Sequence, residues 1–327
     1  MSGGNKKLIK ICISILLAAV LVYFSFKSID WVAFLQNLKC TKWAYIIIFI
    51  ICAVAAILIR ALRWKIMLHP IDPKIKTSTT WHANNIGNLT NSIIPGSGEL
   101  VRCAFACRGG ANYDSVLGTE VMERSWDALA ILILAITALF NGSENVTSFF
   151  KNSILTPLFS HSSNIIWTIC GVVVIVLFIV LCFKFRHTHP LLGKIADFLY
   201  GLGKGFSSFK HMKHKGAFLT LTIMLWAFYI LMYYFILKAV PTLNGLSIFD
   251  ALLLSVVGNL ASVIPVPGGI GAYHYLIALC LSSIYGIEWS IGILFATLQH
   301  ELHALILIVF GVISYFQANF AKPHAHN

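Results

Sequence analysis

Charged residues are scarce in this sequence. Only 11% of its 327 residues are Asp, Glu, Lys or Arg, whereas soluble domains carry about 25%. Hydrophobic residues make up 58% of the chain, and its mean hydropathy is +0.82. The eight cysteines are scattered and include no CxxC pair. This composition excludes a soluble enzyme, a disordered tail and a disulfide scaffold.

Acidic residues are rarer still, because 12 Asp and Glu stand against 24 Lys and Arg. In a membrane protein such an excess is explained by cytoplasmic loops and anionic headgroups, so we expect no nucleic-acid partner. The sequence also lacks a nucleotide-binding motif. The string His300-Glu301-Leu302-His303 does not have the H-E-x-x-H spacing of zinc proteases, so we expect no metal site and no cofactor.

The sequence has instead a series of apolar runs of about 20 residues, each long enough to cross about 30 Å of hydrocarbon. They predict an all-α polytopic membrane protein that forms a single membrane domain over 1–327. The first run is too long for a signal peptide and lacks a small-x-small cleavage site. Six full spans are predicted, over 8–26, 43–64, 115–140, 164–183, 217–239 and 288–316.

Two further apolar stretches, 77–110 and 247–285, are interrupted in the middle by Pro and Gly. Proline cannot continue a helix and glycine frees the backbone to turn, so both stretches predict re-entrant helix–break–helix hairpins. Such backbone persists at membrane depth only where protein or a water-filled cavity surrounds it. The residues assigned to the breaks are Asn88, Pro95 and Gly98 in the first hairpin, and Asn259, Pro265, Gly268 and Gly269 in the second.

The two hairpins resemble each other in sequence. Each contains Gly-Asn-Leu followed by Ser and by Ile-Pro, beginning at Gly87 and at Gly258. They belong to repeat 1 (43–140) and repeat 2 (217–316), which are joined by 164–215, a span plus a cytoplasmic amphipathic linker. The spans that open the two repeats cross in opposite directions. The repeats are therefore predicted to be inverted, which is an architecture of transporters.

The distribution of Lys and Arg predicts the orientation. If both hairpins return to the face from which they came, most basic residues fall on the side that holds both termini. The positive-inside rule then predicts cytoplasmic termini and a multi-pass protein of the cell inner membrane.

Several charged side chains fall inside the apolar segments. Placing one such side chain at the bilayer centre costs at least about 2.5–3.5 kcal/mol on insertion scales, so each of them needs a partner or a role. Glu123, Arg124 and Asp127 share one helical face with Glu120, either as an internal ion-pair network or as part of a substrate path. His300 and His303, near the centre of the last span, are either packing histidines or the lining of a polar path.

Arg60 and Arg63 lie at the cytoplasmic end of the second span. They are either interfacial anchors or a fork that captures a lipid phosphate. Arg102, three residues after Glu99 in the returning leg of the first hairpin, is a sharper candidate, because helix N-terminal N–H groups there also attract anions. The candidate substrate-binding residues are Arg60, Arg63, Glu99, Arg102, Glu123, Arg124, Asp127, His274, His300 and His303.

An ordered set of these motifs resembles the membrane region of the lysylphosphatidylglycerol synthases, a family that also contains stand-alone flippase-like proteins. The motifs are Arg60-x-x-Arg63-Trp64, Gly87-Asn88, Pro95-x-x-Gly98-Glu99-x-x-Arg102 and Glu123-Arg124-x-x-Asp127. The resemblance covers about 43–316 and implies movement of lipid between leaflets. It does not extend to an amine-binding carboxylate that many relatives carry where this chain has His274.

In the full-length relatives a separate soluble aminoacyltransferase domain makes the aminoacyl lipid. Only eleven residues follow Phe316, so we expect this chain to lack that domain and not to be an enzyme. The expected function is transport of a phospholipid or another lipid-linked headgroup, with anionic or aminoacylated membrane lipids as partners. Two alternatives remain, an intramembrane enzyme of lipid modification and a membrane partner of a separately encoded synthase.

Overall fold

The computed structural model describes residues 29–94, 96–141, 212–261 and 269–320 continuously, and single positions around 20–27, 144–148, 177–196 and at 266. The predicted spans 8–26 and 164–183 and the linker lie largely outside the described residues, as do Pro95, Pro265 and Gly268. The chain divides into two compact units, which are described separately. Unit 1 is Met1–Leu117 with His214–Asn327, and unit 2 is Gly118–Lys213.

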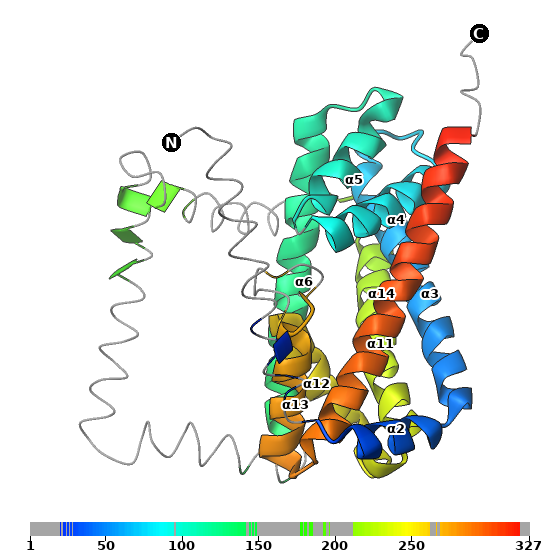
Figure 1. Cartoon of the computed structure of the whole chain (residues 1–327). Helices are drawn as coiled ribbons and strands as arrows, with labels where there is room; N and C mark the ends of the chain where they lie inside the picture. Colours follow the sequence, from blue (N-terminus) through cyan, green and yellow to red (C-terminus); the bar gives the residue numbers. More distant parts are fainter. Residues whose placement is uncertain are drawn as a thin grey trace, which may run out of the picture. The chain divides into compact units, whose positions relative to one another are not determined.

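Within the described part, every regular element is a helix (Figure 1). In chain order these are α2 (Trp31–Lys39), α3 (Trp43–Leu68), α4 (Thr77–Ile93), α5 (Gly98–Ala106), the 3-10 turn η1 (Cys107–Gly109), α6 (Tyr113–Asn141), α11 (Lys215–Ala239), the 3-10 turn η4 (Pro241–Leu243), α12 (Ile248–Ala261), α13 (Ala272–Tyr285) and α14 (Trp289–Phe320).

Three helices are long and apolar enough to cross a membrane. They are α3, α11 and α14, whose most apolar windows have mean hydropathies of 2.8, 1.9 and 1.8. These helices confirm the spans predicted over 43–64, 217–239 and 288–316. The segment predicted over 115–140 is a single long helix, α6, in which the charged residues interrupt the apolar surface. The chain is therefore a multi-pass helical membrane protein.

Helix α2 was not predicted. It is a short helix whose first turn is capped by Asp30, and the carboxylate oxygen of Asp30 accepts from the N–H groups of Val32 (2.9 Å) and Ala33 (3.1 Å). The N–H of Asp30 itself donates to the Ser290 hydroxyl at 3.0 Å, which ties α2 to the start of α14.

Helices α3 and α11 pack side by side and run antiparallel (Figure 1). At one end the N–H of Lys42 donates to the carbonyl of Ala239 at 2.8 Å. At the other end the rings of His69 and His214 meet edge to face, 6.0 Å apart. We call these the Lys42 end and the His69 end of unit 1. Between them, apolar side chains of both helices, including Phe49 of α3, form part of the main buried core.

Helices α4 and α5 form the first hairpin. Ile94, which precedes Pro95, has extended backbone (φ −128°), because a residue before proline disfavours the helical region, and α4 ends there. Gly96, which follows Pro95 in the sequence, has a φ of +77°, which reverses the chain at no steric cost. The two legs approach closely at Gly87 and Gly98, since a Cβ on Gly98 would overlap the Gly87 carbonyl oxygen.

Helices α12 and α13 form the second hairpin, and their outer ends are joined. Asp250, at the start of α12, accepts from Ser247 in a reciprocal capping box, N–H to Oδ2 at 2.8 Å. Its other carboxylate oxygen accepts from the Tyr285 hydroxyl, at the end of α13, at 2.7 Å. Near the break, Gly269 and Gly271 have φ values of +73° and +84°. Both hairpins therefore fold back, as predicted from their Pro and Gly content.

Helix α14 contacts both hairpins, at two glycines. A Cβ on Gly311 would meet Leu89 Cβ of α4 at 2.6 Å, and a Cβ on Gly292 would meet Ala278 Cα of α13 at 2.9 Å. At 1.5 Å of rise per residue the two glycines are about 28 Å apart along the axis. The polar residues in the middle of α14 therefore lie between the two hairpin contacts.

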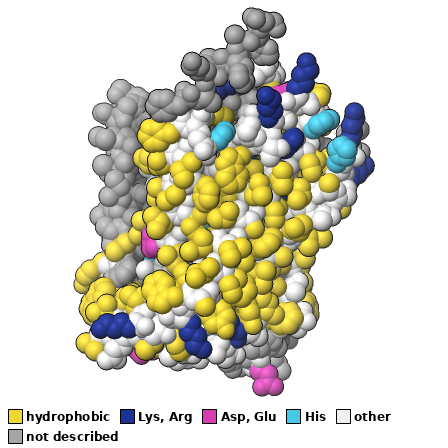
Figure 2. All heavy atoms as spheres, turned by 90° about the vertical axis from the view of Figure 1, so that its right-hand side faces the viewer, with side chains coloured by type: hydrophobic (Ala, Val, Ile, Leu, Met, Phe, Trp, Pro, Cys, Tyr) yellow, Lys and Arg dark blue, Asp and Glu magenta, His cyan; other side chains and the backbone are white. Residues whose placement is uncertain are grey.

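One face of the molecule carries a broad belt of hydrophobic side chains (Figure 2). Lys and Arg lie at both ends of this belt, and His gathers at one end. The exposed apolar residues include Ile47 and Ile51 of α3, each 60% exposed, and Ile308 and Ile313 of α14, which are 37% and 44% exposed. Such a surface is unfavourable in water and suited to lipid.

Candidate functional site

Hairpin 1 places a buried arginine against α3. Arg102 is only 3% exposed, and its guanidinium carbon lies 3.9 Å from the centre of the Trp64 ring, which is a cation–π contact. Arg63, the residue before Trp64, is completely buried, and its guanidinium lies 6.0 Å from the Phe218 ring of α11. Of the two arginines predicted from the sequence, Arg102 therefore lies against α3, and Arg63 lies between α3 and α11.

The turn of hairpin 1 is held by Asn91. Its side-chain carbonyl accepts from the N–H of Gly98 at 2.7 Å, and its amide nitrogen lies 3.3 Å from Glu99 Oε1. Ser97, the residue at the usual capping position, makes no such cap on α5. Asn91 therefore fixes the first turn of α5, and with it the position of Glu99 and of Arg102 one turn later. Asn88, which the sequence assigned to the break, lies within α4.

Hairpin 2 places a pair of buried tyrosines at its Gly-Asn motif. The Tyr273 hydroxyl of α13 donates to the Tyr233 hydroxyl of α11 at 3.0 Å. A Cβ on Gly258 would overlap Tyr233 Oη and approach Tyr273 Cε2 to 2.8 Å, so the pair lies directly on this glycine.

The predicted histidines gather next to this pair. His300 Nδ1 lies 3.0 Å from Glu301 Oε1, and His274 Nε2 of α13 lies 3.7 Å from the same oxygen. The ring of Tyr273 lies over the ring of His300 with 4.8 Å between centres. A Cβ on Gly269 would be 3.3 Å from His300 Nε2, so the break of hairpin 2 lies against this histidine.

A row of polar side chains extends between the two hairpins within unit 1. His303 lies one turn after His300 on α14, and Arg60 of α3 lies within electrostatic range of it. Arg60 is followed one turn later by Arg63, next to the contact between Trp64 and Arg102. We call this set the polar row. Its members are His274, His300, Glu301, His303, Arg60, Arg63 and Arg102.

The remaining predicted residues lie in unit 2. On α6, Arg124 Nε pairs with Glu120 Oε1 at 3.1 Å, an interaction one turn apart along the helix. Glu123 is fully buried, Asp127 is half-buried, and the Arg124 side chain is 44% exposed. The structure shows the ion pair that one sequence interpretation predicted. It does not relate Glu123, Arg124 or Asp127 to the polar row, and their part in a substrate path stays a prediction.

Sequence reasoning missed Asn91, Tyr233 and Tyr273. A tyrosine in an apolar run looks like an ordinary interfacial aromatic, and Asn91 looks like one more polar residue before a proline. The available signal for the tyrosines was Gly258 itself, because a glycine inside a helical pattern often marks a close approach by another group.

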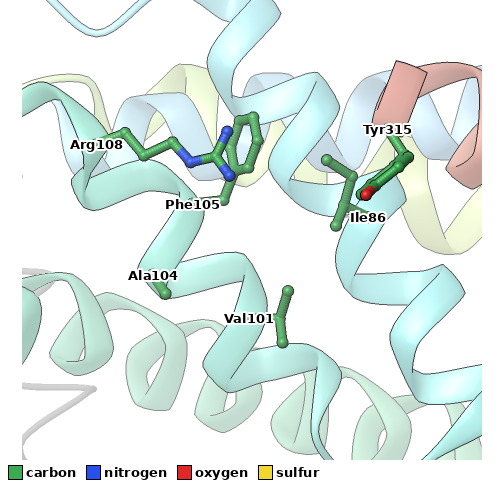
Figure 3. A pocket seen from close by; sticks show the side chains of 6 residues that line it. All are labelled: Ile86, Val101, Ala104, Phe105, Arg108 and Tyr315. Atoms are coloured by element: carbon green, nitrogen blue, oxygen red, sulfur yellow. The ribbon is translucent and has the colours of Figure 1, made fainter. Parts of the chain in front are cut away.

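Hairpin 1 and the end of α14 enclose a half-open pocket of about 270 Å³. Figure 3 shows the Arg108 guanidinium lying over the Phe105 ring, with Tyr315 and Ile86 across the pocket. The guanidinium carbon is 4.2 Å from the centre of that ring. Val101 and Ala104 complete an otherwise apolar lining. The pocket combines a cationic rim with an apolar interior.

The described residues include no group of three or more His, Cys, Asp or Glu side chains that could hold a metal ion. The cluster on α14 instead offers hydrogen-bond donors and acceptors together with guanidinium groups. Its chemistry suits recognition of a polar, anionic group within the helix bundle.

The fold and the polar row define a multi-pass helical membrane protein with charged side chains buried between its helices. The chain belongs to the family described as the lysylphosphatidylglycerol synthase TM region, which it matches over residues 11–311. Membership relates the protein to lipid modification or lipid transport. Searches of curated proteins and of solved structures gave no match.

Proposed function

We propose that this protein moves a phospholipid, or another lipid-linked headgroup, between the leaflets of the cell inner membrane. The observation that supports the proposal most is the polar row, which extends from the break of hairpin 2 through the middle of α14 to the buried arginines beside hairpin 1. Buried charged groups in a membrane protein are costly and usually mark a substrate or ion pathway.

The proposal includes an inverted repeat in which α3 to α6 correspond to α11 to α14. The antiparallel contact between α3 and α11 supports it, as does the equivalent use of the two Gly-Asn motifs. In each hairpin the glycine of the first leg admits a close neighbour from the second leg. Gly87 faces Gly98 and Arg102, and Gly258 faces Tyr273. Broken helices that meet near the midplane are typical of transporters with this architecture.

In the proposed mechanism the acyl chains stay in lipid while the headgroup follows the polar row. The planar guanidinium groups of Arg63 and Arg102 can each donate two hydrogen bonds to a phosphate. The cation–π contact with the Trp64 ring orients Arg102. His300 and His303 then supply ring nitrogens as donors at mid-depth, next to Glu301. Rocking of the two repeats against each other would open the row to one leaflet at a time. The charge distribution supports a cytoplasmic location for the His69 end and for both termini.

Leaflet sidedness in reconstituted liposomes tests the proposal. The wild type should move fluorescent phosphatidylglycerol faster than protein-free liposomes, and Arg102→Gln should reduce that rate at least tenfold. Arg108→Gln is the matched control, because Arg108 lies on the same hairpin segment, is exposed and is outside the polar row. It should retain the wild-type rate.

Folding is checked by thermal unfolding of each variant. If Arg102→Gln does not fold, Arg102→Lys keeps the charge but loses the planar fork, and it should still translocate more slowly than Arg108→Gln. A folded Arg102 variant that moves lipid at the wild-type rate contradicts the proposed role. Equal rates for wild-type and empty liposomes contradict the proposed function.

A further inference from the structure

A second half-open pocket, of about 290 Å³, lies at the His69 end of unit 1, between α3 and α11. It shares no residue with the polar row or with the pocket at hairpin 1. Its lining combines three basic side chains with an apolar floor, namely Lys65, His69 and His214 with Leu62, Ile66 and Leu221. The residues that line it include no carboxylate.

The helix ends position the three basic groups. His69 immediately follows α3 and His214 immediately precedes α11, and their rings meet edge to face at 6.0 Å. Lys65 lies one turn before His69, and its ammonium donates to the Thr77 hydroxyl at 2.9 Å. An ammonium has three donor hydrogens, so this bond orients Lys65 and leaves donors for another acceptor. Each imidazole offers a ring N–H in either tautomer.

The two helix ends at this site have opposite dipoles, because α3 ends where α11 begins. Backbone N–H groups at a helix start have no partners within the helix, and the helix dipole is positive there. His214 occupies the capping position of α11 but does not cap it with its side chain. Because the C-terminal end of α3 offsets this dipole, the attraction for an anion comes from the side-chain donors of Lys65, His69 and His214.

The floor indicates which kind of anion fits. Leu62, Ile66 and Leu221 are half-buried, and the exposed Leu58 of α3 and Met224 of α11 lie one turn from Leu62 and Leu221 on the same helix faces. Figure 2 shows His gathering at one end of the hydrophobic belt, where lipid headgroups would lie. A free phosphate would leave this floor exposed to water, whereas a phospholipid would cover it. The volume is near the lower limit for ligand pockets, which suits a phosphate and the first methylenes of a lipid.

We propose that this pocket is a binding site for one anionic phospholipid of the surrounding leaflet, separate from the transport path. Lys65, His69 and His214 bind the phosphate, and the glycerol and first methylenes lie on Leu62, Ile66 and Leu221. Such a bound lipid would link the end of α3 to the start of α11 at the His69 end.

Lipid binding to the purified full chain, measured by native mass spectrometry, tests this proposal. Phosphatidylglycerol should occupy one high-affinity site. Phosphatidylcholine should have at least fivefold lower affinity for that first site. The double variant His69→Gln with His214→Gln should weaken that first site at least fivefold. Lys74→Gln is the matched control, since it removes an exposed positive charge from the loop that follows α3, and it should bind as the wild type does.

Two further measurements keep the outcome clear. Leu221→Trp fills the floor without changing a charge, and it should weaken the same site even if the histidine variants do not fold. Excess inorganic phosphate should not displace the lipid. Displacement by phosphate would assign the pocket to free anions, and unchanged phosphatidylglycerol binding in Leu221→Trp or in the double variant would overturn the proposal. The readout is binding, so it does not depend on whether the polar row transports lipid.

Discussion

Gly258 determines how closely three helices approach one another at hairpin 2. Tyr233 from α11 and Tyr273 from α13 both lie against its missing side chain, and their hydroxyls are hydrogen-bonded to each other. A buried hydroxyl that loses its partner costs about 1–3 kcal/mol. The glycine therefore makes room for a polar pair that the surrounding apolar core would otherwise exclude.

Gly258→Ala should destabilise the protein by about 1–3 kcal/mol, because the added methyl group forces both tyrosines out of position. Gly118→Ala is the control, since no heavy atom lies within 4 Å of a Cβ there and alanine favours the helix. Thermal unfolding followed by tryptophan fluorescence distinguishes them. A Gly258→Ala protein as stable as the Gly118→Ala protein would show that the close packing at hairpin 2 is wrong.

At the residue scale, the sequence predicted charged and imidazole groups better than neutral polar ones. Arg63, Arg102 and His300 stand out because a charge or an imidazole in an apolar run is costly and needs an explanation. Asn91 and Tyr233 do not stand out, because their importance depends on which helix lies opposite. That information is tertiary and is absent from local sequence.

At the scale of helices and hairpins, the turn of hairpin 1 depends on a side chain that precedes it. Asn91 lies near the end of α4, yet it caps the first turn of α5 and contacts Glu99. Because this cap joins both legs, it stabilises the hairpin as well as the helix end. The same turn sets where Arg102 faces Trp64.

Asn91→Ala should reduce stability by about 1–2 kcal/mol through loss of the cap and of the donor to Glu99. Asn91→Asp keeps an acceptor for Gly98 but places a second carboxylate beside Glu99, so it should also be less stable than the wild type. Asn141→Ala, at the exposed end of α6, should change stability by less than about 0.5 kcal/mol. If unfolding by denaturant gives the same midpoint for Asn91→Ala and Asn141→Ala, the turn does not depend on Asn91.

The sequence predicted the long elements well and the short ones poorly. Spans such as 43–64 and both hairpins follow from hydropathy and from the chemistry of Pro and Gly, which act locally. Helix α2 was missed because it has only nine residues, follows an apolar run and is recognisable mainly by its cap at Asp30. Its position also depends on Ser290, which lies far away in the sequence.

At the scale of the whole molecule, the proposed inverted repeat predicts that the two ends of unit 1 face opposite sides of the membrane. The loop after α3 and the loop after α11 lie at opposite ends, since His69 meets His214 and Lys42 meets Ala239. From the excess of Lys and Arg we propose that the His69 end faces the cytoplasm.

Single cysteines at Lys74 and Gly245 should therefore react differently with an impermeant thiol reagent in intact cells. In a background without the eight native cysteines, the cysteine at 245 should be labelled and the cysteine at 74 should be labelled only after the membrane is permeabilised. Both positions are exposed, so accessibility to the reagent does not differ through burial. Labelling of position 74 from outside would reverse the orientation.

The central claim is that a lipid headgroup travels along the polar row at mid-depth, and photo-crosslinking tests it most directly. Phosphatidylglycerol that carries a photoreactive group on its headgroup is reconstituted with the protein, irradiated, and its attachment sites are mapped by mass spectrometry. The account predicts attachment on α14 around His300 and His303 and on α3 around Arg60. Attachment confined to the helix ends, near His69 and Lys42, would contradict it.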